Sequence, residues 1–171
     1  CHIVHRLDRD TSGVMVFAKD RETKDYLQTQ FAGREVKRLY HALVEGRPEE
    51  NEGTDSSWLI EDKHLHVKRV KSTFKGSKQS ITHWRIEDHD EFVSLIEVII
   101  ETGRRHQIRM AMQFLDCPIV GDVKHGAETD PLNRVCLHAT SLSFLHPASN
   151  QFTQYDSSVP FANRVNIDSE T

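Results

Sequence analysis

The first segment whose residue types suit chemistry lies at the start of the chain. Asp8 stands between Arg6 and Arg9, in a turn-rich stretch that continues through Thr11 to Gly13. Neighbouring guanidinium groups hold a carboxylate ionised and oriented, as a carboxylate nucleophile requires. The alternative is structural: an aspartate in such a stretch can cap a turn by accepting hydrogen bonds from local backbone N–H groups.

A second cluster consists of three arginines, Arg104, Arg105 and Arg109, at an expected junction between a strand and a helix. We expect the helix to follow Gly103, which would place Arg105 and Arg109 on one helical face. Helix N-termini and arginine side chains both favour anions such as phosphate or carboxylate. The cluster therefore indicates an acidic partner, with an exposed basic face as the alternative.

A third candidate is Tyr40, within the alternating segment 38–45 that predicts a strand. A phenol that faces a cleft can stack on a nucleobase or transfer a proton. A tyrosine that only packs in the sheet is the alternative.

The chain has 11 histidines, and His64 and His66 would share one face of a strand. No third ligand stands at a spacing typical of zinc sites, so no metal site is expected. The motifs GxSxG, Walker A and GxGxxG are all absent from the sequence.

The elements that must position these residues predict an α+β fold, with a largely antiparallel mixed sheet and flanking helices. Helices are expected from the Asp20 cap to Gly33, and from Gly103 to the Cys117–Pro118 stop. Residues 49–57 are expected to be a polar loop and 88–91 a hairpin turn. Strands are expected at residues 14–18, 38–45, 65–70, 80–86, 92–101, 136–145 and 152–155.

Composition bounds the class of protein. The 171 residues suit one domain, 1–171, and 37% hydrophobic residues are enough for a core. No apolar run reaches the roughly 18 residues that a membrane-spanning helix needs, and the first residues do not resemble a secretory signal. Three cysteines without a CxxC pair suit free thiols in a reducing compartment. We therefore expect neither a membrane protein nor a secreted one.

Charge is unevenly distributed although the net charge is only −4. Seven acidic residues and a single arginine lie within 45–62, whereas residues 63–85 hold seven basic residues and no acidic one. The basic block, with Lys68, Arg69 and Lys71 at its centre, could contact phosphates. A solvated pair of strands is the alternative.

Taken in order, these segments resemble the RluA-type pseudouridine synthases. The sequence from His5 to Gly13 (HRLDRDTSG) is close to the catalytic signature of that family, and residues 38–46 (RLYHALVEG) resemble its tyrosine strand. Residues 102–109 (TGRRHQIR) and 117–122 (CPIVGD) resemble its third motif. The similarity extends to about Pro160.

The resemblance implies that Asp8 attacks the target uridine, that Arg109 pairs with Asp8 and that Tyr40 stacks on the base. An Asp8–Arg109 pair would keep the carboxylate charged, whereas burial alone would raise its pKa. Substrate contacts are expected from the following residues: Arg6, Arg9, Thr11, Arg105, His106, Gln107, Lys68, Arg69 and Lys71. A uridine within a stem would have to be flipped out of it. Family members need no metal and no cofactor.

The expected function is therefore an RNA pseudouridine synthase that acts on ribosomal or transfer RNA, in the cytoplasm and as a monomer. An RNA-binding module that has lost turnover is one alternative, because family members carry further strands before the first motif. A metal-dependent hydrolase that uses the histidines is another. The sequence departs from the family pattern at Ala111, Asp116 and His125, which puts the identity of the substrate in question more than the reaction.

Overall fold

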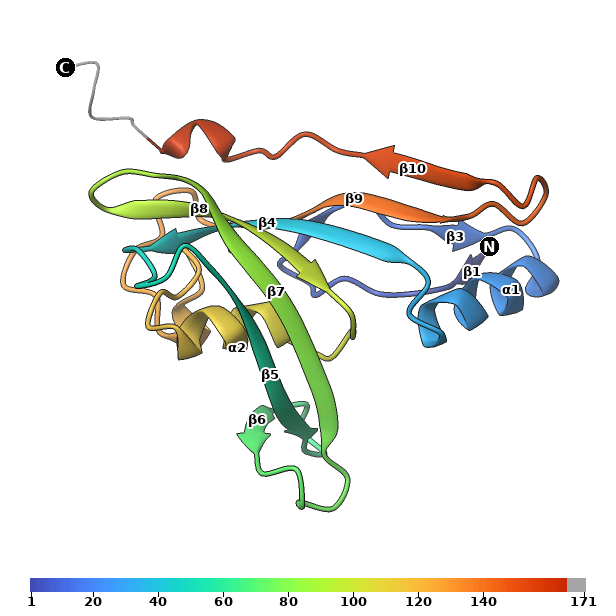
Figure 1. Ribbon diagram of the computed structural model, residues 1–171, viewed down its shortest axis with the longest axis horizontal. Helices are drawn as coiled ribbons and strands as arrows, with labels where there is room; N and C mark the ends of the chain where they lie inside the picture. The colour runs from blue at the N-terminus through green and yellow to red at the C-terminus, as the bar shows by residue number, and fades with distance from the viewer. Residues whose placement is uncertain (166–171) are drawn as a thin grey trace.

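The protein is described by a computed structural model over residues 1–165, in which a twisted sheet carries two α-helices (Figure 1). The strand order is β10-β9-β4-β8-β7-β5-β6, with neighbours antiparallel, and β2 joins β9 in parallel. The strands are β1 (His2–Ile3), β2 (Ser12–Gly13), β3 (Phe17–Ala18), β4 (Lys37–Glu45), β5 (Glu52–Glu61), β6 (Val67–Val70), β7 (Lys78–His89), β8 (Val93–Ile100), β9 (Leu137–Leu145) and β10 (Phe152–Asp156). The helices are α1 (Arg21–Ala32), α2 (Gln107–Phe114) and the short 3₁₀ turns η1 (Val123–His125) and η2 (Ala162–Arg164). The expected α+β class is confirmed.

Helix α1 begins and ends as its sequence predicts. The side chain of Asp20 accepts a hydrogen bond of 2.8 Å from the backbone N–H of Thr23, and Gly33 is the C-cap. Buried Gln30 then joins the helix to β9, because its amide both donates to the backbone C=O of Leu145 (3.0 Å) and accepts from the N–H of Leu145 (2.8 Å).

The main core lies between the centre of the sheet and α2. Strand β4 is buried from Tyr40 to Val44, and α2 contributes Ile108, Ala111 and Met112 to the same apolar cluster. This packing holds α2 against the sheet, next to β7, so side chains of α2 and β4 share one apolar cluster.

The expected polar loop at 49–57 is wrong, because most of it belongs to β5. Glu52 pairs with Arg85 of β7, and the ladder continues to the pair Leu59–Lys78. Polar side chains are tolerated in this strand because β5 and β7 run out from the body of the protein as an arm (Figure 1). The predicted strand at 65–70 shrinks to β6, because Leu65 adopts a left-handed conformation with a φ of 64°.

Three other boundaries differ from the sequence-based expectation. Only β3 remains of the strand at 14–18, because the N–H groups of Val14 and Val16 donate to the C=O of Ala139 (2.9 Å) and to Nε2 of His5 (3.1 Å). Strand β7 reaches His89, which shortens the turn expected at 88–91. Helix α2 begins at Gln107 and not after Gly103.

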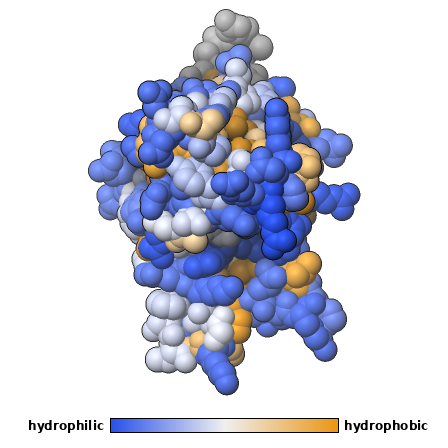
Figure 2. Space-filling view, turned by 90° about the vertical axis from the view of Figure 1, so that its right-hand side faces the viewer, coloured by the Kyte–Doolittle hydropathy of each residue, from blue (hydrophilic) through white to orange (hydrophobic). Residues whose placement is uncertain are grey.

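The surface at the α1 end of the molecule is mainly hydrophilic with scattered apolar side chains (Figure 2). Within the described range, no helix combines the length and the apolar character needed to cross a membrane. The cysteines of the chain are free thiols, and Cys117 and Cys136 are buried.

Candidate active site

The loop that carries Asp8 is anchored to β9 through a glycine. Gly13 has a φ of 123°, and a Cβ atom there would lie 2.1 Å from the carbonyl oxygen of Ala139. Only glycine fits such a close approach of two backbones. The N–H of Thr11 also donates to the C=O of Asp8 (2.9 Å), which closes a turn. The loop therefore has a fixed position beside the sheet.

A cavity of about 550 Å³ opens between this loop, β4 and the segment that precedes α2. Asp8 and Tyr40 both line it, although they are far apart in the sequence. Its wall also includes other residues expected to contact substrate: Arg6, Arg9, Thr11, Arg105 and Gln107. Arg109 and His106 are not part of the wall, and neither are Lys68, Arg69 and Lys71.

Burial dominates the electrostatics of Asp8. Removal from water raises the pKa of its carboxyl above the ordinary value. The charge of Arg109 is the largest opposing influence, followed by a hydrogen bond from the backbone N–H of His106 and by the charge of Arg105. Arg109 thus opposes the effect of burial on the pKa of Asp8 but does not reverse it.

The direct partner of Arg109 is Asp122. Nε and Nη2 of Arg109 donate to the two carboxylate oxygens of Asp122 at 2.8 and 2.7 Å, and both residues are at most 3% exposed. Nη1 lies 3.8 Å from a carboxylate oxygen of Asp10. The expected Asp8–Arg109 ion pair is absent from residues 1–165, where Arg109 acts on Asp8 only through space.

Asp122 owes its place to the glycine before it. Gly121 has a φ of 82°, and a Cβ there would lie 1.9 Å from the carbonyl oxygen of Arg134. Gly121 and Asp122 both belong to the third motif, so the sequence drew attention to them. Nothing in the motif indicated that Asp122 pairs with Arg109.

Tyr40 is 8% exposed, and its phenol stays protonated at neutral pH. Burial raises its pKa, Asp8 raises it further and Arg38 opposes both. A neutral phenol can donate a hydrogen bond or stack on a ring, but it does not act as a phenolate base at this pH.

His106 explains why the helix starts late. Its φ of 54° is left-handed, so the chain cannot be helical through it, and Arg105 lies outside α2. The expectation that Arg105 and Arg109 share a helical face is wrong. Arg105 instead forms an ion pair of 3.0 Å with Glu61 of β5.

The His106 imidazole is neutral at physiological pH, because burial and Arg109 lower its pKa to about 4. Its Nδ1 lies 3.0 Å from Nε2 of His125. The side chain thus faces away from the cavity wall, while the backbone N–H supports Asp8.

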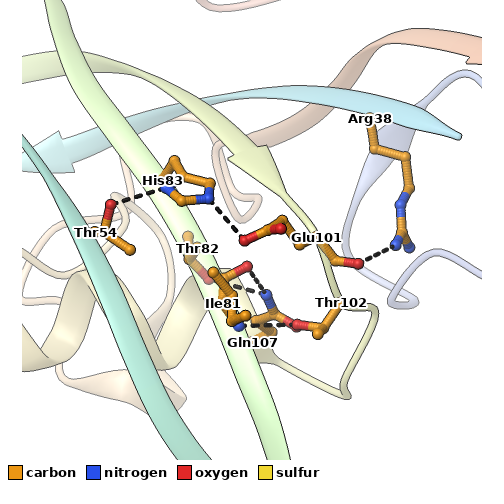
Figure 3. Close-up of polar contacts among 8 residues, drawn as sticks. All are labelled: Arg38, Thr54, Ile81, Thr82, His83, Glu101, Thr102 and Gln107. Atoms are coloured by element: carbon orange, nitrogen blue, oxygen red, sulfur yellow. Dashed lines mark hydrogen bonds and ion pairs between the residues drawn. The ribbon is translucent and has the colours of Figure 1, made fainter. Parts of the chain in front are cut away.

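Gln107 lines the cavity, but its amide is fully engaged (Figure 3). Its oxygen accepts from the hydroxyl of Thr102 (2.7 Å) and the N–H of Arg104 (3.0 Å). Its nitrogen donates to the C=O of Ile81 (2.9 Å) and the hydroxyl of Thr82 (3.0 Å). Because an amide offers two donors and two acceptor lone pairs, Gln107 has none left, and it positions the loop before α2.

The three residues at the centre of the basic block, Lys68, Arg69 and Lys71, lie on β6 or directly after it, in the arm. Arg69 is already paired with Asp55, with hydrogen bonds of 2.8 and 3.1 Å, and its guanidinium stacks over Phe114 at 4.0 Å. Lys68 and Lys71 are exposed. Two of the three are therefore available to phosphates without breaking an ion pair.

One group of possible metal ligands occurs in the described part of the chain: His41, Glu87 and Glu97. His41 contacts Glu87 at 2.6 Å, and Glu97 accepts a hydrogen bond of 2.7 Å from Arg85. Because His41 directly follows Tyr40 in β4, its side chain points to the opposite face of the sheet. The group therefore has no access to the cavity that holds Asp8, which disfavours the metal-dependent hydrolase.

A sequence profile described as RNA pseudouridylate synthase matches residues 1–114. The chain belongs to this family. It is 36% identical over 159 residues to the uncharacterized RNA pseudouridine synthase YhcT of Bacillus subtilis, covering 92% of this chain and 52% of that protein. It is 33% identical over 167 residues to the ribosomal large subunit pseudouridine synthase D of Zymomonas mobilis, with the same coverage of 92% and 52%.

The fold agrees with this membership. The solved structure of human RNA pseudouridylate synthase domain containing 1 superposes with a TM-score of 0.80 at 26% identity, covering 96% of this chain and 71% of that one. The chain spans about half the length of the curated relatives that it matches.

The cavity combines the half-buried Asp8 with several arginines, an arrangement suited to a polyanion. Sequence reasoning missed two residues of this site: Asp122, which holds Arg109, and the cavity-lining residue Arg38. Arg104 belonged to the expected arginine cluster, but it was not among the residues expected to contact substrate. Arg38 and Arg104 both lie inside the motifs that carried the resemblance, but their side chains could not be placed from spacing.

Proposed function

We propose that this chain, as one domain over 1–171, is the catalytic part of an RNA pseudouridine synthase with Asp8 as its nucleophile. The observation that carries the proposal is the meeting of Asp8 and Tyr40 in one arginine-lined cavity. Membership of the family supports it.

The reaction is an internal isomerisation. The Asp8 carboxylate adds either to the anomeric carbon of the ribose or to the uracil ring. The bond between N1 of uracil and C1′ breaks, and a bond between C5 and C1′ forms. The bond to Asp8 breaks again with its electron pair returning to the carboxylate, the proton on C5 is lost and N1 gains one. No atom is added or removed overall, so the step needs no oxidant, reductant or activated water.

The other side chains have separate duties. Arg109, held by Asp122, supplies positive charge behind Asp8 and favours the ionised carboxylate. Tyr40, as a neutral phenol, stacks on the uracil or donates a hydrogen bond to it. Arg6 and Arg9 flank Asp8 in its loop and line the cavity. They contact phosphates of the RNA strand from which the uridine is flipped.

Ribosomal RNA is the favoured substrate, because relatives named ribosomal large subunit pseudouridine synthase D match over most of this chain. Transfer RNA is the second candidate. Buried free thiols at Cys117 and Cys136 support a reducing compartment such as the cytoplasm. We further propose that the protein is a monomer, which size-exclusion chromatography with light scattering would test.

Incubation of the protein with unmodified ribosomal and transfer RNA, followed by chemical mapping of pseudouridine, tests the function. Pseudouridine at a defined uridine supports the proposal. Binding of the RNA without any product would favour the RNA-binding module and contradict an active enzyme.

A further inference from the structure

Arg38 is a cavity residue for which the reaction described above has no use. It lies in β4, and its alternation with Tyr40 places both side chains on the same face of the sheet. Its side chain extends from β4 toward the end of β8, where the terminal nitrogen Nη2 lies 3.5 Å from the backbone oxygen of Glu101 (Figure 3).

The guanidinium of Arg38 is under-satisfied. Nε is buried and has no hydrogen-bond partner. No carboxylate in residues 1–165 forms an ion pair with it, and its other close neighbour is the ring of Phe31 at 5.4 Å. Arg38 as a whole is half-buried, but its buried Nε–H donor is left unsatisfied, which is unfavourable and which a bound ligand can correct.

A second arginine stands beside it. Arg104 also lines the cavity, donates from Nε to the C=O of Gln79 (2.9 Å) and has no acidic partner among the described residues. Burial lowers the pKa of each guanidinium. The charge of Arg104 lowers the pKa of Arg38 further, and the charge of Arg34 does the same to Arg104. Two such cations together favour an anion between them.

Gly103 gives Arg38 its room. A Cβ atom at Gly103 would lie 2.7 Å from Nη1 of Arg38, so any larger residue would displace the guanidinium. The backbone of Gly103 has no left-handed conformation that would explain the glycine otherwise.

The anion bound here is not the Asp8 carboxylate. The guanidinium groups that lower the pKa of Asp8 are those of Arg109 and Arg105, whereas Arg38 acts on the phenol of Tyr40. Arg105 and Arg109 thus act on the reactive carboxylate, whereas Arg38 acts on Tyr40.

Resting on the proposed function, we propose that Arg38 and Arg104 form a phosphate subsite that binds a backbone phosphate next to the uridine held at Asp8. Arginine suits this task because its planar fork of donors matches a phosphate. The subsite would fix the flipped nucleotide from its backbone while Tyr40 holds its base. Arg38 is then a positioning residue that determines where the uridine sits.

The test is binding of fluorescein-labelled decauridylate, followed by anisotropy over a range of KCl concentrations. Arg38→Met is expected to weaken binding about tenfold or more at low salt, as for a lost hydrogen bond to a charged group. The slope of log K against log salt should become shallower by about 0.7, the value for one phosphate on a single strand. Arg38→Lys should retain the slope of the wild type and lose part of the affinity.

Gly103→Ala is the sharpest variant, because it displaces the Arg38 guanidinium without changing the charge of the protein. It should weaken binding in the same direction as Arg38→Met but less, because the end of the arginine side chain can move aside. The matched control is Arg47→Met, which removes an exposed arginine whose hydrogen-bond partner within residues 1–165 is Asn51. The melting temperature shows whether a variant is still folded. Because Arg38 has no ion-pair partner in residues 1–165, Arg38→Met should melt no lower than the wild type.

Equal affinity and equal salt slope in Arg38→Met and Arg47→Met would overturn the subsite. A large fall in melting temperature of Arg38→Met would also overturn it, because Arg38 would then be a structural residue. Failure of the wild type to form pseudouridine, with the Arg38 effect on binding intact, would contradict the proposed function and leave the subsite supported.

Discussion

Asp122 holds Arg109 by two parallel hydrogen bonds of 2.8 and 2.7 Å in a nearly fully buried pair. Planar, bidentate pairing of this kind fixes the guanidinium in one orientation. The remaining nitrogen, Nη1, is directed toward the loop of Asp8, with Asp10 at 3.8 Å. The positive charge behind Asp8 is therefore placed by a residue outside the cavity wall.

Breaking this pair should destabilise the protein strongly. Asp122→Asn leaves the Arg109 charge buried and unpaired, and we expect a loss of about 3–5 kcal/mol in the free energy of unfolding. Chemical denaturation measures it. The double variant Asp122→Leu/Arg109→Met should recover much of the loss, because it removes both charges. A loss in the double variant equal to the summed losses of Asp122→Leu alone and Arg109→Met alone would contradict the pairing.

The pH dependence of turnover should follow the carboxyl of Asp8. Because burial raises its pKa, turnover at saturating RNA should fall on the acidic side at a pH above the ordinary aspartate value of about 3.9. Arg105→Gln removes a charge that lowers this pKa, so the acidic limb should move to higher pH. Its control is Arg85→Gln, on the opposite side of the sheet, which should leave the limb in place. A limb unmoved by Arg105→Gln would mean that another group titrates.

Many of the helices and strands were predictable, because the residues that indicate them lie within or next to each element. Asp20 and Gly33 delimit α1, and the apolar runs of β4, β8 and β9 are unmistakable in the sequence. Strand β5 was missed because its first half is polar, with Glu52, Thr54 and Ser56 exposed. Polar composition alone cannot distinguish such a strand from a loop.

The sequence predicted which residues belong to the site better than it predicted their hydrogen-bond and ion-pair partners. Asp8 and Tyr40 meet as the motifs indicated, but the partner of Arg109 proved to be Asp122. The full engagement of Gln107 depends on oxygen atoms of β7, which no spacing reveals. The net direction of the Asp8 pKa shift depends on burial, which is a property of the folded chain.

The exposed lysines of the arm should govern the salt dependence of RNA binding. Lys68→Gln and Lys71→Gln should each make the slope of log K against log salt shallower by about 0.7 for a single strand. The Arg47→Gln control should not change it. Unchanged slopes for both lysine variants would mean that the arm faces only water.

Arg69 should behave differently from these lysines. Its charge is paired with Asp55 and its guanidinium packs on Phe114, so Arg69→Met should lower the free energy of unfolding by roughly 1–3 kcal/mol. The salt slope should stay nearly constant. Urea denaturation beside anisotropy distinguishes the two effects, and a shallower slope without loss of stability would show a direct phosphate contact.

The ionised Asp8 carboxyl should lower the stability of the protein, in addition to its role in the reaction. Folding raises the pKa of the Asp8 carboxyl. The free energy of unfolding of the protein therefore falls as the pH rises from the unfolded pKa of this carboxyl, about 3.9, through its folded pKa. Asp8→Asn should therefore melt higher than the wild type at pH 7, and the difference should shrink toward pH 3. Thermal melts across this range measure it, and a variant that melts lower at pH 7 would contradict the direction of the shift.

Pseudouridine formation by Asp8→Asn, compared with the wild type on the same RNA, tests the central claim most directly. Under single-turnover conditions, with the product measured by mass spectrometry, we expect a loss of more than about 10³-fold while RNA affinity is retained. Normal turnover by Asp8→Asn would contradict the assignment of Asp8 as the nucleophile.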